Sequence, residues 1–298
     1  MLIIKHILFP QDFSEQSRDV AVAVRKLACQ FGAEVTMMSV LPPIWEQLGV
    51  TFESGGAFGA IEAPARSHVD MEELKAGLDA RLAATATREL VGVPVRRIVE
   101  TGDPAESIVA FAQSEGADLI MMATRGHGPF RSLLLGSVAA KVLHDAHCPV
   151  WTSAHASEPV VARPAQRNIL CAVDGTPKTV PVMEWAAEWA SAVGGTLRLV
   201  HAIPGMQAWP DRQMNHEFEA ALMQQARETI ERQQQAAGIG AALGVGTGDI
   251  AAVVREEALR HSSDLVVIGR GLLDGTFGRL RTHSYGIIRL APCPVISV

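Results

Sequence analysis

A chain of 298 residues is long enough for two ordinary domains, and its 48% hydrophobic and 19% charged residues are typical of compact globular proteins. The formal net charge is −6, with 26 Lys and Arg against 32 Asp and Glu and no dense basic run, so nucleic acid is not an expected partner. No apolar run approaches the roughly 18 residues that cross a bilayer, and no signal-peptide pattern is present, so we expect no membrane association. The cysteines, Cys29, Cys148, Cys171 and Cys293, show no C-x-x-C spacing, which favours a reducing cytoplasm.

Strands and helices alternate along the first half of the chain. The apolar run over 3–9 predicts a strand that is covered on both faces. A helix over 15–31 is predicted next, because apolar residues such as Val20, Val24 and Leu27 recur at three- and four-residue spacing. The later predicted elements are a strand over 34–41, a helix around 68–90, a strand over 93–100, a helix over 104–115, a strand over 118–123, a helix over 137–145 and a strand over 149–153. This alternation predicts a parallel, doubly wound α/β sheet, which binds ligands at the carboxyl ends of its strands.

The second half of the chain repeats the first. The segment around the first predicted strand reappears 162 residues later, so that Asp12 corresponds to Asp174. Further on, residues 101–123 match residues 247–269 at an offset of 146. The match extends over nearly the whole chain, which indicates the duplication of one domain.

The repeat divides the chain into two domains and a linker. We expect an N-terminal domain over 1–155, a linker rich in Pro and Ala over 156–166 and a C-terminal domain over 167–298. The last predicted strands of the two domains, 149–153 and 294–298, would otherwise have unpaired edges. We therefore expect the domains to pair through these strands as an intramolecular pseudo-dimer, and a homodimer of two chains stays open.

The loop after the fourth strand of the first half, TRGHGPFRSLLLGS (124–137), has the features of an anion site. Nine residues separate Gly126 from Gly136, and Gly136 with Ser137 opens the next predicted helix. Glycines let the backbone approach phosphate oxygens, and the N-terminus of a helix supplies N–H groups and a positive dipole end. The Ser137 hydroxyl can donate to a phosphate or cap the helix. The same pattern also fits a flexible connection that ends in an ordinary N-cap, so the loop alone does not decide between the two.

Both halves resemble the universal stress protein family over almost their full length. The resemblance rests on the stretches ILFPQDFSEQS, GADLIMMATRGHG and LLLGSVAAKVLHDAHCPV. It implies two tandem, doubly wound, parallel five-stranded sheets of flavodoxin-like order, as in adenine nucleotide alpha hydrolase-like proteins. It also implies binding of ATP, or of ADP or AMP in its place.

The family's site residues map onto the first half of this sequence. The resemblance implies that Asp12 contacts the ribose or base, with Pro10 alongside, and that Val40 offers backbone groups to adenine. The residues that it assigns to the phosphates are Gly126, Gly136, Ser137 and Val138. Arg125, His127 and Arg131 flank the glycines and are further candidates for phosphate contacts. A magnesium ion bridged by Asp12 and the phosphates is in keeping with how Mg²⁺ is usually held.

The first half departs from the family pattern at two positions. The family's nucleotide loop reads Gly, two residues, Gly, nine residues, Gly, then Ser or Thr, and Ala123 stands here for the first glycine. Gln11 stands where the family usually has a threonine before the aspartate. The change to Ala123 adds one methyl group, which fits most backbone conformations of negative φ.

The second half has a degenerate version of the loop, VIGRGLLDGTFGRLRTHSYG (267–286). Gly269 keeps the first glycine, but Arg281 stands at the position of Gly136, so a long side chain replaces the open backbone that a phosphate needs. We therefore expect one nucleotide site rather than two. The second-half candidates for a ligand contact are Asp174, Gly269, Gly271, Arg281 and Thr282.

The sequence contains no recognisable catalytic set. It has no G-x-x-x-x-G-K-[ST] P-loop, and no histidine stands at a spacing from a serine or cysteine that indicates acyl transfer. His144, His147 and Cys148 are close in sequence, but no second cluster supplies the other ligands of a metal site. We therefore expect neither a catalytic residue nor a metal held by the protein alone.

Three functions stay open. The sequence favours a cytoplasmic stress-response binding module whose first half holds ATP or ADP and whose conformation or partners depend on that nucleotide. The second is a slow ATP hydrolase or a phosphoryl or nucleotidyl transferase, for which no base or water-positioning residue is evident. The third is an interaction protein without a ligand, which is favoured if Gln11 and Ala123 close the site.

Overall fold

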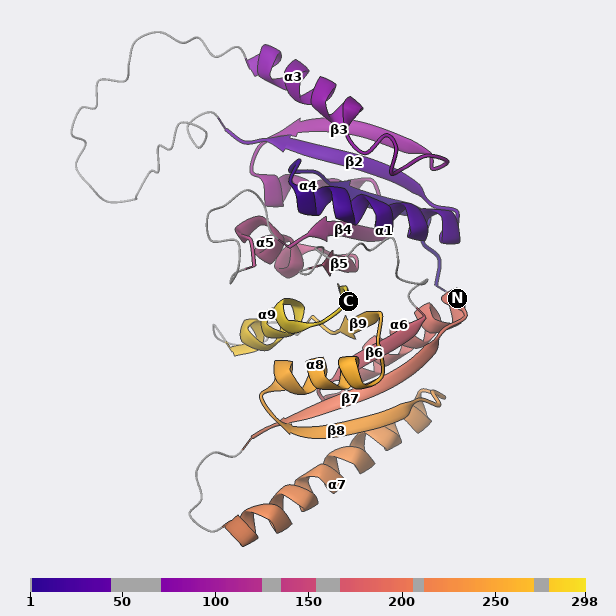
Figure 1. Ribbon diagram of the computed structural model, residues 1–298, viewed down its shortest axis with the longest axis vertical. Coiled ribbons are helices and arrows are strands. Elements are labelled where there is room, and N and C mark those ends of the chain that lie inside the picture. Colours follow the sequence, from indigo (N-terminus) through magenta and orange to yellow (C-terminus); the bar gives the residue numbers. More distant parts are fainter. Residues whose placement is uncertain (1, 44–70, 125–134, 154–166, 206–211, 271–278) are drawn as a thin grey trace, which may run out of the picture.

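The strands of both halves lie in one sheet (Figure 1). The computed structural model describes residues 2–43, 71–124, 135–153, 167–205, 212–270 and 279–298. Its ten described strands follow the order β3-β2-β1-β4-β5-β10-β9-β6-β7-β8. Their bounds are β1 (His6–Pro10), β2 (Glu34–Leu41), β3 (Val95–Thr101), β4 (Leu119–Ala123), β5 (Val150–Ser153), β6 (Asn168–Val173), β7 (Thr196–Pro204), β8 (Ala242–Gly248), β9 (Leu265–Ile268) and β10 (Val295–Ser297).

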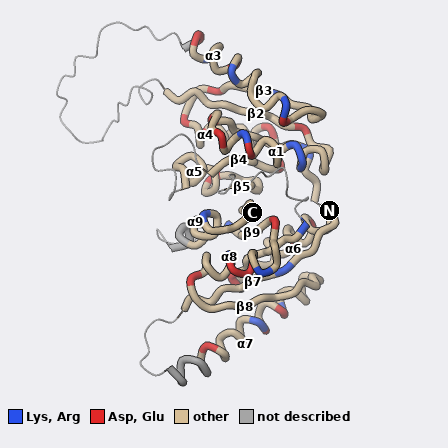
Figure 2. Tube along the Cα trace, viewed as in Figure 1, with Lys and Arg blue, Asp and Glu red and all other residues tan. Residues whose placement is uncertain are grey.

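Helices alternate with these strands along the chain (Figure 1). Their bounds are α1 (Glu15–Phe31), α3 (Met71–Ala84), α4 (Pro104–Ser114), α5 (Ser137–Asp145), α6 (Thr179–Val193), α7 (Arg212–Ala236), α8 (Ile250–Arg260) and α9 (Arg279–Leu290). Among the described residues, no helix combines the length and the apolarity that crossing a membrane requires. Acidic and basic residues are interspersed over both halves (Figure 2).

Each half is a doubly wound parallel sheet. The first five strands pair in parallel in the order β3-β2-β1-β4-β5, and the last five repeat this order as β8-β7-β6-β9-β10. The predicted fold class, two tandem doubly wound parallel five-stranded sheets, is confirmed. Within each half the strands follow the order 3-2-1-4-5, whereas the order expected of a flavodoxin-like sheet is 2-1-3-4-5. In the first half the order reverses between β1 and β4, and such a switch point is where doubly wound sheets bind ligands.

Two hydrophobic clusters cover the two faces of the sheet. Successive side chains of a strand point to opposite faces, so Ile7 and Phe9 belong to one cluster and Leu8 to the other. Residues of α1 and α6 belong to the first cluster, and residues of α5 and α8 belong to the second. Because both clusters contain residues of both halves, the core is continuous along the chain.

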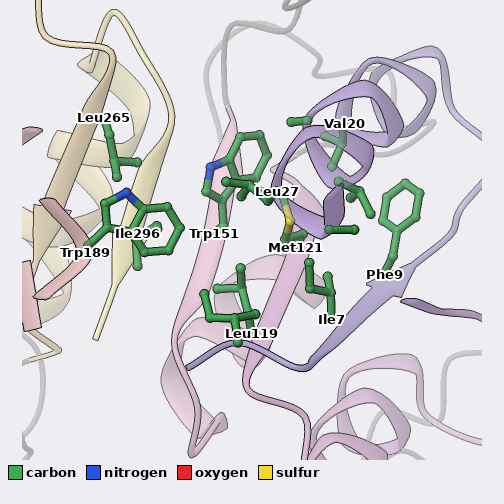
Figure 3. Packing of buried hydrophobic residues seen from close by; sticks show 14 of the residues in the cluster. Ile7, Phe9, Val20, Leu27, Leu119, Met121, Trp151, Trp189, Leu265 and Ile296 are labelled. Atoms are coloured by element: carbon green, nitrogen blue, oxygen red, sulfur yellow. The ribbon is translucent and has the colours of Figure 1, made fainter. Parts of the chain in front are cut away.

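The halves join through the antiparallel pair of β5 and β10. The register places Trp151 opposite Ile296, and Thr152 Oγ1 donates to the carbonyl oxygen of Val295 at 3.3 Å. On one face of the sheet, the rings of Phe31 in the first half and Trp189 in the second have centroids 5.4 Å apart. Figure 3 shows labelled side chains of both halves packed near this junction. The predicted pairing through the last strands is confirmed, and it merges two sheets into one.

Most predicted elements have the expected bounds, with one clear difference. Ser14 is the N-cap of α1, where its side chain accepts a backbone N–H, and Gly32 ends the helix with a φ of 66°. The helix predicted around 68–90 is described only from Met71 and ends at Ala84. Ala86 has a φ of 54°, and this left-handed conformation cannot continue a right-handed helix.

Candidate functional site

The first strand ends in a turn that Asp12 fixes. Its Oδ1 accepts hydrogen bonds from the backbone N–H and the hydroxyl of Ser14, at 3.0 and 2.7 Å, and from the hydroxyl of Ser17. Phe13, inside the turn, has a φ of 62°, which residues other than glycine rarely adopt. Such positions persist only where the surrounding structure holds them, and they gather at functional sites. The Asp12 carboxylate is therefore held in a defined place at the carboxyl end of β1.

The same turn recurs in the second half. Asp174 Oδ1 accepts from the backbone N–H and the hydroxyl of Thr176, at 3.0 and 2.8 Å, and from the hydroxyl of Thr179 at 2.7 Å. Gly175 occupies the place of Phe13 with a φ of 76°. Burial raises the pKa of Asp174, but the hydrogen bonds from Thr179 and Thr176 outweigh burial and hold the pKa below its ordinary 3.8. The shared Asp-x-Ser/Thr-x-x-Ser/Thr spacing is visible in both halves of the sequence, and sequence reasoning missed it.

Pro10 and Val40 lie at the carboxyl ends of neighbouring strands. Pro10 ends β1 opposite Met38 of β2, and Val40 is the last residue but one of β2. The backbone N–H of Gln11 donates to the carbonyl oxygen of Met38 at 2.7 Å, and Ser39 Oγ donates to the carbonyl oxygen of Gln11 at 3.2 Å. These bonds extend the pairing of β1 and β2, so the residues predicted for the base and ribose lie together at the carboxyl ends of these two strands.

The side chain of Gln11 is buried. It is 5% exposed, and neither its Oε1 nor its Nε2 has a hydrogen-bond partner among the residues that the structure describes. A buried polar group left unpaired costs about 1–3 kcal/mol. The departure from the family's threonine therefore places an unsatisfied amide beside the Asp12 turn.

The N-terminus of α5 lies at the end of β4. Gly136 is its N-cap, with φ −61° and ψ 147°, and as a glycine it has no side chain that could cap the helix. The backbone N–H of Gly136 donates to the carbonyl oxygen of Thr124 at 2.8 Å, which brings the two ends of the glycine loop together. Ser137 is exposed, and Val138 is half-buried against the core. The other predicted phosphate contacts, Arg125, Gly126, His127 and Arg131, lie outside the described residues.

The first glycine of the family loop is a packing position in this fold. In the second half it is Gly269, and a Cβ added there would meet Val182 Cγ2 at 2.9 Å. In the first half it is Ala123, which is buried in the same cluster as Val20, the counterpart of Val182. The structure thus accommodates the methyl group of Ala123 in the core.

The second half differs from the first where its loop meets the following helix. Arg281 and Thr282, which the repeat aligns with Gly136 and Ser137, lie inside α9, because that helix begins at Arg279. Gly271 lies outside the described residues. The aligned position is therefore a helix start in the first half and a helix interior in the second.

The described residues contain no candidate metal-binding cluster. Among them, no group of three or more His, Cys, Asp or Glu side chains is arranged to hold an ion. His144 Nδ1 instead contacts Asp145 Oδ1. Burial raises the pKa of Cys148, and burial raises the pKa of Cys171 to about 12, so both thiols stay protonated at neutral pH.

Comparison with known proteins identifies the same repeat. The model of the universal stress protein family matches residues 4–153 and again residues 166–298. The universal stress protein MJ0531 of Methanocaldococcus jannaschii is 35% identical over 146 residues, which make up 49% of this chain and 79% of that protein.

A solved structure that covers nearly the whole chain shares the fold. A universal stress protein from Archaeoglobus fulgidus covers 98% of this chain and 95% of its own length, with a TM-score of 0.67 and 21% identity. Another structure from that organism, solved in complex with dAMP, covers 50% of this chain and 97% of its own, with a TM-score of 0.33 and 20% identity.

Proposed function

The chain belongs to the universal stress protein family, with the family's domain present twice, and we propose that its first half binds an adenine nucleotide: ATP, or ADP or AMP in its place. The N-terminus of α5 carries this proposal. Its N-cap residue, Gly136, has no side chain, and the helix follows β4, next to the point where the strand order reverses.

The phosphates would lie against the first turn of α5. The first N–H groups of a helix have no acceptor within it and carry partial positive charge, which suits an anion. Gly136 leaves the approach open because it has no side chain, and Ser137 offers an exposed hydroxyl. From the family motif, we propose Val138 as a further backbone contact, and the loop residues Arg125, Gly126, His127 and Arg131 as the remaining ones.

The base and ribose would lie at the ends of β1 and β2. We propose Pro10 and Asp12 for the ribose or base side and Val40 for backbone bonds to adenine. Since β1 lies between β2 and β4, the two ends of the site are two strand spacings apart, about 10 Å. A nucleotide is long enough to span that distance.

We propose that the nucleotide is bound rather than consumed. A hydrolase or transferase needs a base or a water-positioning group beside the phosphates. Asp12, the carboxylate proposed for the ribose or base side, accepts three hydrogen bonds from the turn on its Oδ1, which supports a structural role. A magnesium ion would be held mainly by the phosphates, with Asp12 as the proposed protein ligand.

The proposed role is that of a stress-response module whose conformation or partners depend on the bound nucleotide. The cytoplasm is the proposed location, because all four cysteines are free thiols in the structure. We propose one nucleotide per chain, because the second half has a helix interior where the first has the start of α5. Its remaining candidates, Asp174, Gly269, Gly271, Arg281 and Thr282, would then have no nucleotide to contact.

Native mass spectrometry of the purified protein tests this proposal. The expected result is one adenine nucleotide per chain, either co-purified or added, with no loss of the bound triphosphate over a hydrolysis time course. Absence of binding at millimolar ATP would remove the proposed function, and steady turnover would favour the enzymatic alternative.

A further inference from the structure

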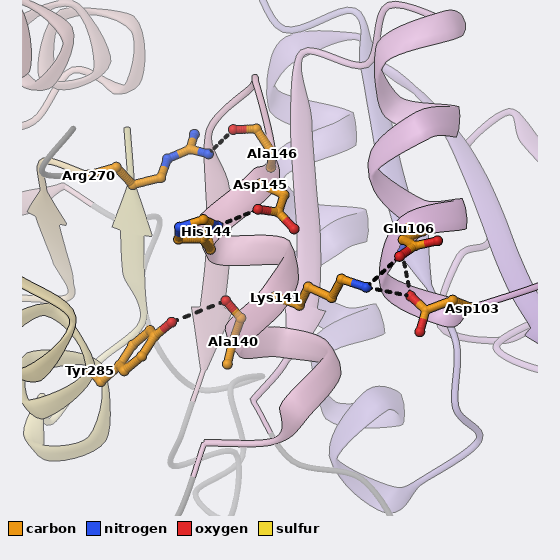
Figure 4. Close-up of polar contacts among 9 residues, drawn as sticks. All are labelled: Asp103, Glu106, Ala140, Lys141, His144, Asp145, Ala146, Arg270 and Tyr285. Atoms are coloured by element: carbon orange, nitrogen blue, oxygen red, sulfur yellow. Dashed lines mark hydrogen bonds and ion pairs between the residues drawn. The ribbon is translucent and has the colours of Figure 1, made fainter. Parts of the chain in front are cut away.

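Helix α5 is held by contacts from both of its flanks (Figure 4). On the side of the first half, Lys141 Nζ donates to Asp103 Oδ1 at 3.3 Å and to Glu106 Oε1 at 2.7 Å, which ties α5 to the start of α4. On the other side, the contacts come from the second half of the chain. Tyr285 of α9 donates its hydroxyl hydrogen to the carbonyl oxygen of Ala140 at 3.2 Å.

Arg270 supplies the second contact from the second half. Its guanidinium donates from Nη1 to the carbonyl oxygen of Ala146 and from Nη2 to the carbonyl oxygen of Cys148. Ala146 is the C-cap of α5, so a cation lies at the negative end of that helix dipole. The backbone of Arg270 is itself anchored, because its N–H donates to the carbonyl oxygen of Val298 at 2.7 Å.

This arrangement is not repeated in the opposite direction. The repeat aligns Arg270 with Thr124, whose Oγ1 donates to the carbonyl oxygen of Ser153 within its own half at 3.1 Å. Lys141 likewise aligns with Gly286, where an added Cβ would meet Ala251 Cβ at 3.2 Å. Arg270 of the second half thus contacts α5 of the first half, whereas the corresponding position of the first half holds Thr124, which is not a cation.

The two ends of α5 are mechanically linked. The helix has nine residues and is therefore about 14 Å long, and a helix this short moves as one body. An anion binds most tightly at the N-terminus of the helix when the first-turn N–H groups are already oriented, because binding then costs less conformational entropy. Contacts that hold the C-terminal end of α5 therefore also fix the end at which phosphates would bind.

We propose that Arg270 is a positioning residue: from the second half it holds the C-terminal end of α5, and through that helix it sets the affinity of the first half for the phosphates of a nucleotide. The proposal rests on the proposed function and assigns a task to the second half. Burial lowers the pKa of the Arg270 guanidinium, but arginine stays protonated at physiological pH, so the contact is permanent rather than a pH switch.

Calorimetric titration of Arg270→Leu with ATP and with adenosine tests this proposal, because adenosine lacks the phosphates. ATP affinity should fall by about fivefold or more, the lower range of measured couplings between sites, while adenosine affinity stays within about twofold. Arg270→Lys keeps the charge but loses the paired donors, and it should restore part of the ATP affinity. Arg255→Leu, on an exposed position of α8, is the matched control and should leave both affinities unchanged.

Two results would overturn the proposal while leaving the proposed function intact. One is that Arg270→Leu binds ATP as the wild type does, and the other is that ATP and adenosine lose affinity equally. If the wild type binds no ATP, the proposed function fails and this proposal fails with it. Should Arg270→Leu not fold, Tyr285→Phe removes the hydroxyl alone, and it should weaken ATP binding without weakening adenosine binding.

Discussion

The backbone N–H of Gly136 donates to the carbonyl oxygen of Thr124 at 2.8 Å, so the start of α5 is joined to the residue that follows β4. This one bond places the start of α5 beside β4 and therefore next to β1, which pairs with β4. The helix N-terminus and the Asp12 turn therefore follow neighbouring strands, β4 and β1, at the switch point of the first half.

The amide of Gln11, which has no hydrogen-bond partner in the described part of the chain, predicts a stabilising substitution. Methionine has a similar volume and no group that needs a hydrogen bond, so Gln11→Met should raise the free energy of unfolding by about 1 kcal/mol. Urea denaturation at neutral pH measures the change.

Gln234 provides the matched control for this substitution. It is also buried, but its Nε2 donates to the carbonyl oxygen of Ala241 at 2.8 Å. Gln234→Met should therefore lower the free energy of unfolding by about 1 kcal/mol. Equal losses in the two variants would mean that the Gln11 amide has a partner after all.

The hydrogen bonds of Asp174 predict a pH dependence of stability. The pKa of this carboxyl in the folded state lies below 3.8, its ordinary value. Its contribution to the free energy of unfolding is therefore fully present above pH 3.8 and is lost as the pH falls through the folded-state pKa. Asp174→Asn should lower the free energy of unfolding by about 1 kcal/mol at neutral pH. This is a low figure for a hydrogen bond to a charged group, because the carboxylate is partly exposed and screened by solvent.

Urea midpoints of wild type and Asp174→Asn, followed from neutral pH into the acid range, measure this effect. The difference between the two proteins should shrink as the pH falls below 3.8. A difference that is constant with pH would show that the charge of the carboxylate does not matter to the turn.

The junction between the halves predicts a large loss of stability at Trp189. This side chain is fully buried and packs against Phe31 of the other half. Trp189→Ala should lower the free energy of unfolding by about 3–5 kcal/mol. Its neighbour Trp185 stacks on it at 5.2 Å between centroids but is only partly buried, so Trp185→Ala should cost clearly less.

Circular dichroism during urea unfolding compares the two tryptophan variants. If the halves form one cooperative core, Trp189→Ala shifts the unfolding of the whole chain. Separate transitions for two halves, of which only one moves, would contradict a continuous core.

Much of the fold could be predicted because local signals decide it. Helix α1 has its predicted bounds since Ser14 caps it and Gly32 ends it, and both signals lie within the helix and its flanks. The pairing of β5 with β10 was predictable because each half would otherwise leave an edge strand unpaired.

Other features depend on contacts that sequence patterns do not contain. Gly269, the residue after β9, packs against Val182 of α6, and nothing local distinguishes it from a phosphate-binding glycine. The bonds of Arg270 to Ala146 and Cys148 cross between the halves over more than a hundred residues. Such contacts follow from the tertiary arrangement, whereas the Asp12 turn was missed although its spacing is visible in the sequence.

The central claim is that the N-terminus of α5 binds the phosphates of a nucleotide, and a substitution at Gly136 tests it most directly. The backbone angles of Gly136, φ −61° and ψ 147°, are open to any residue, so Gly136→Arg should fold normally. The arginine side chain would occupy the approach to the first turn of α5. Gly77→Arg is the matched control, because Gly77 is exposed on α3 and an added Cβ would meet nothing within 4 Å.

Calorimetric titration of ATP into the three proteins gives the decisive comparison. Wild type and Gly77→Arg should bind one ATP per chain with the same affinity, and Gly136→Arg should bind at least about tenfold more weakly, a loss of about 1.4 kcal/mol. Equal affinity in Gly136→Arg and wild type would contradict the account and move the site away from α5.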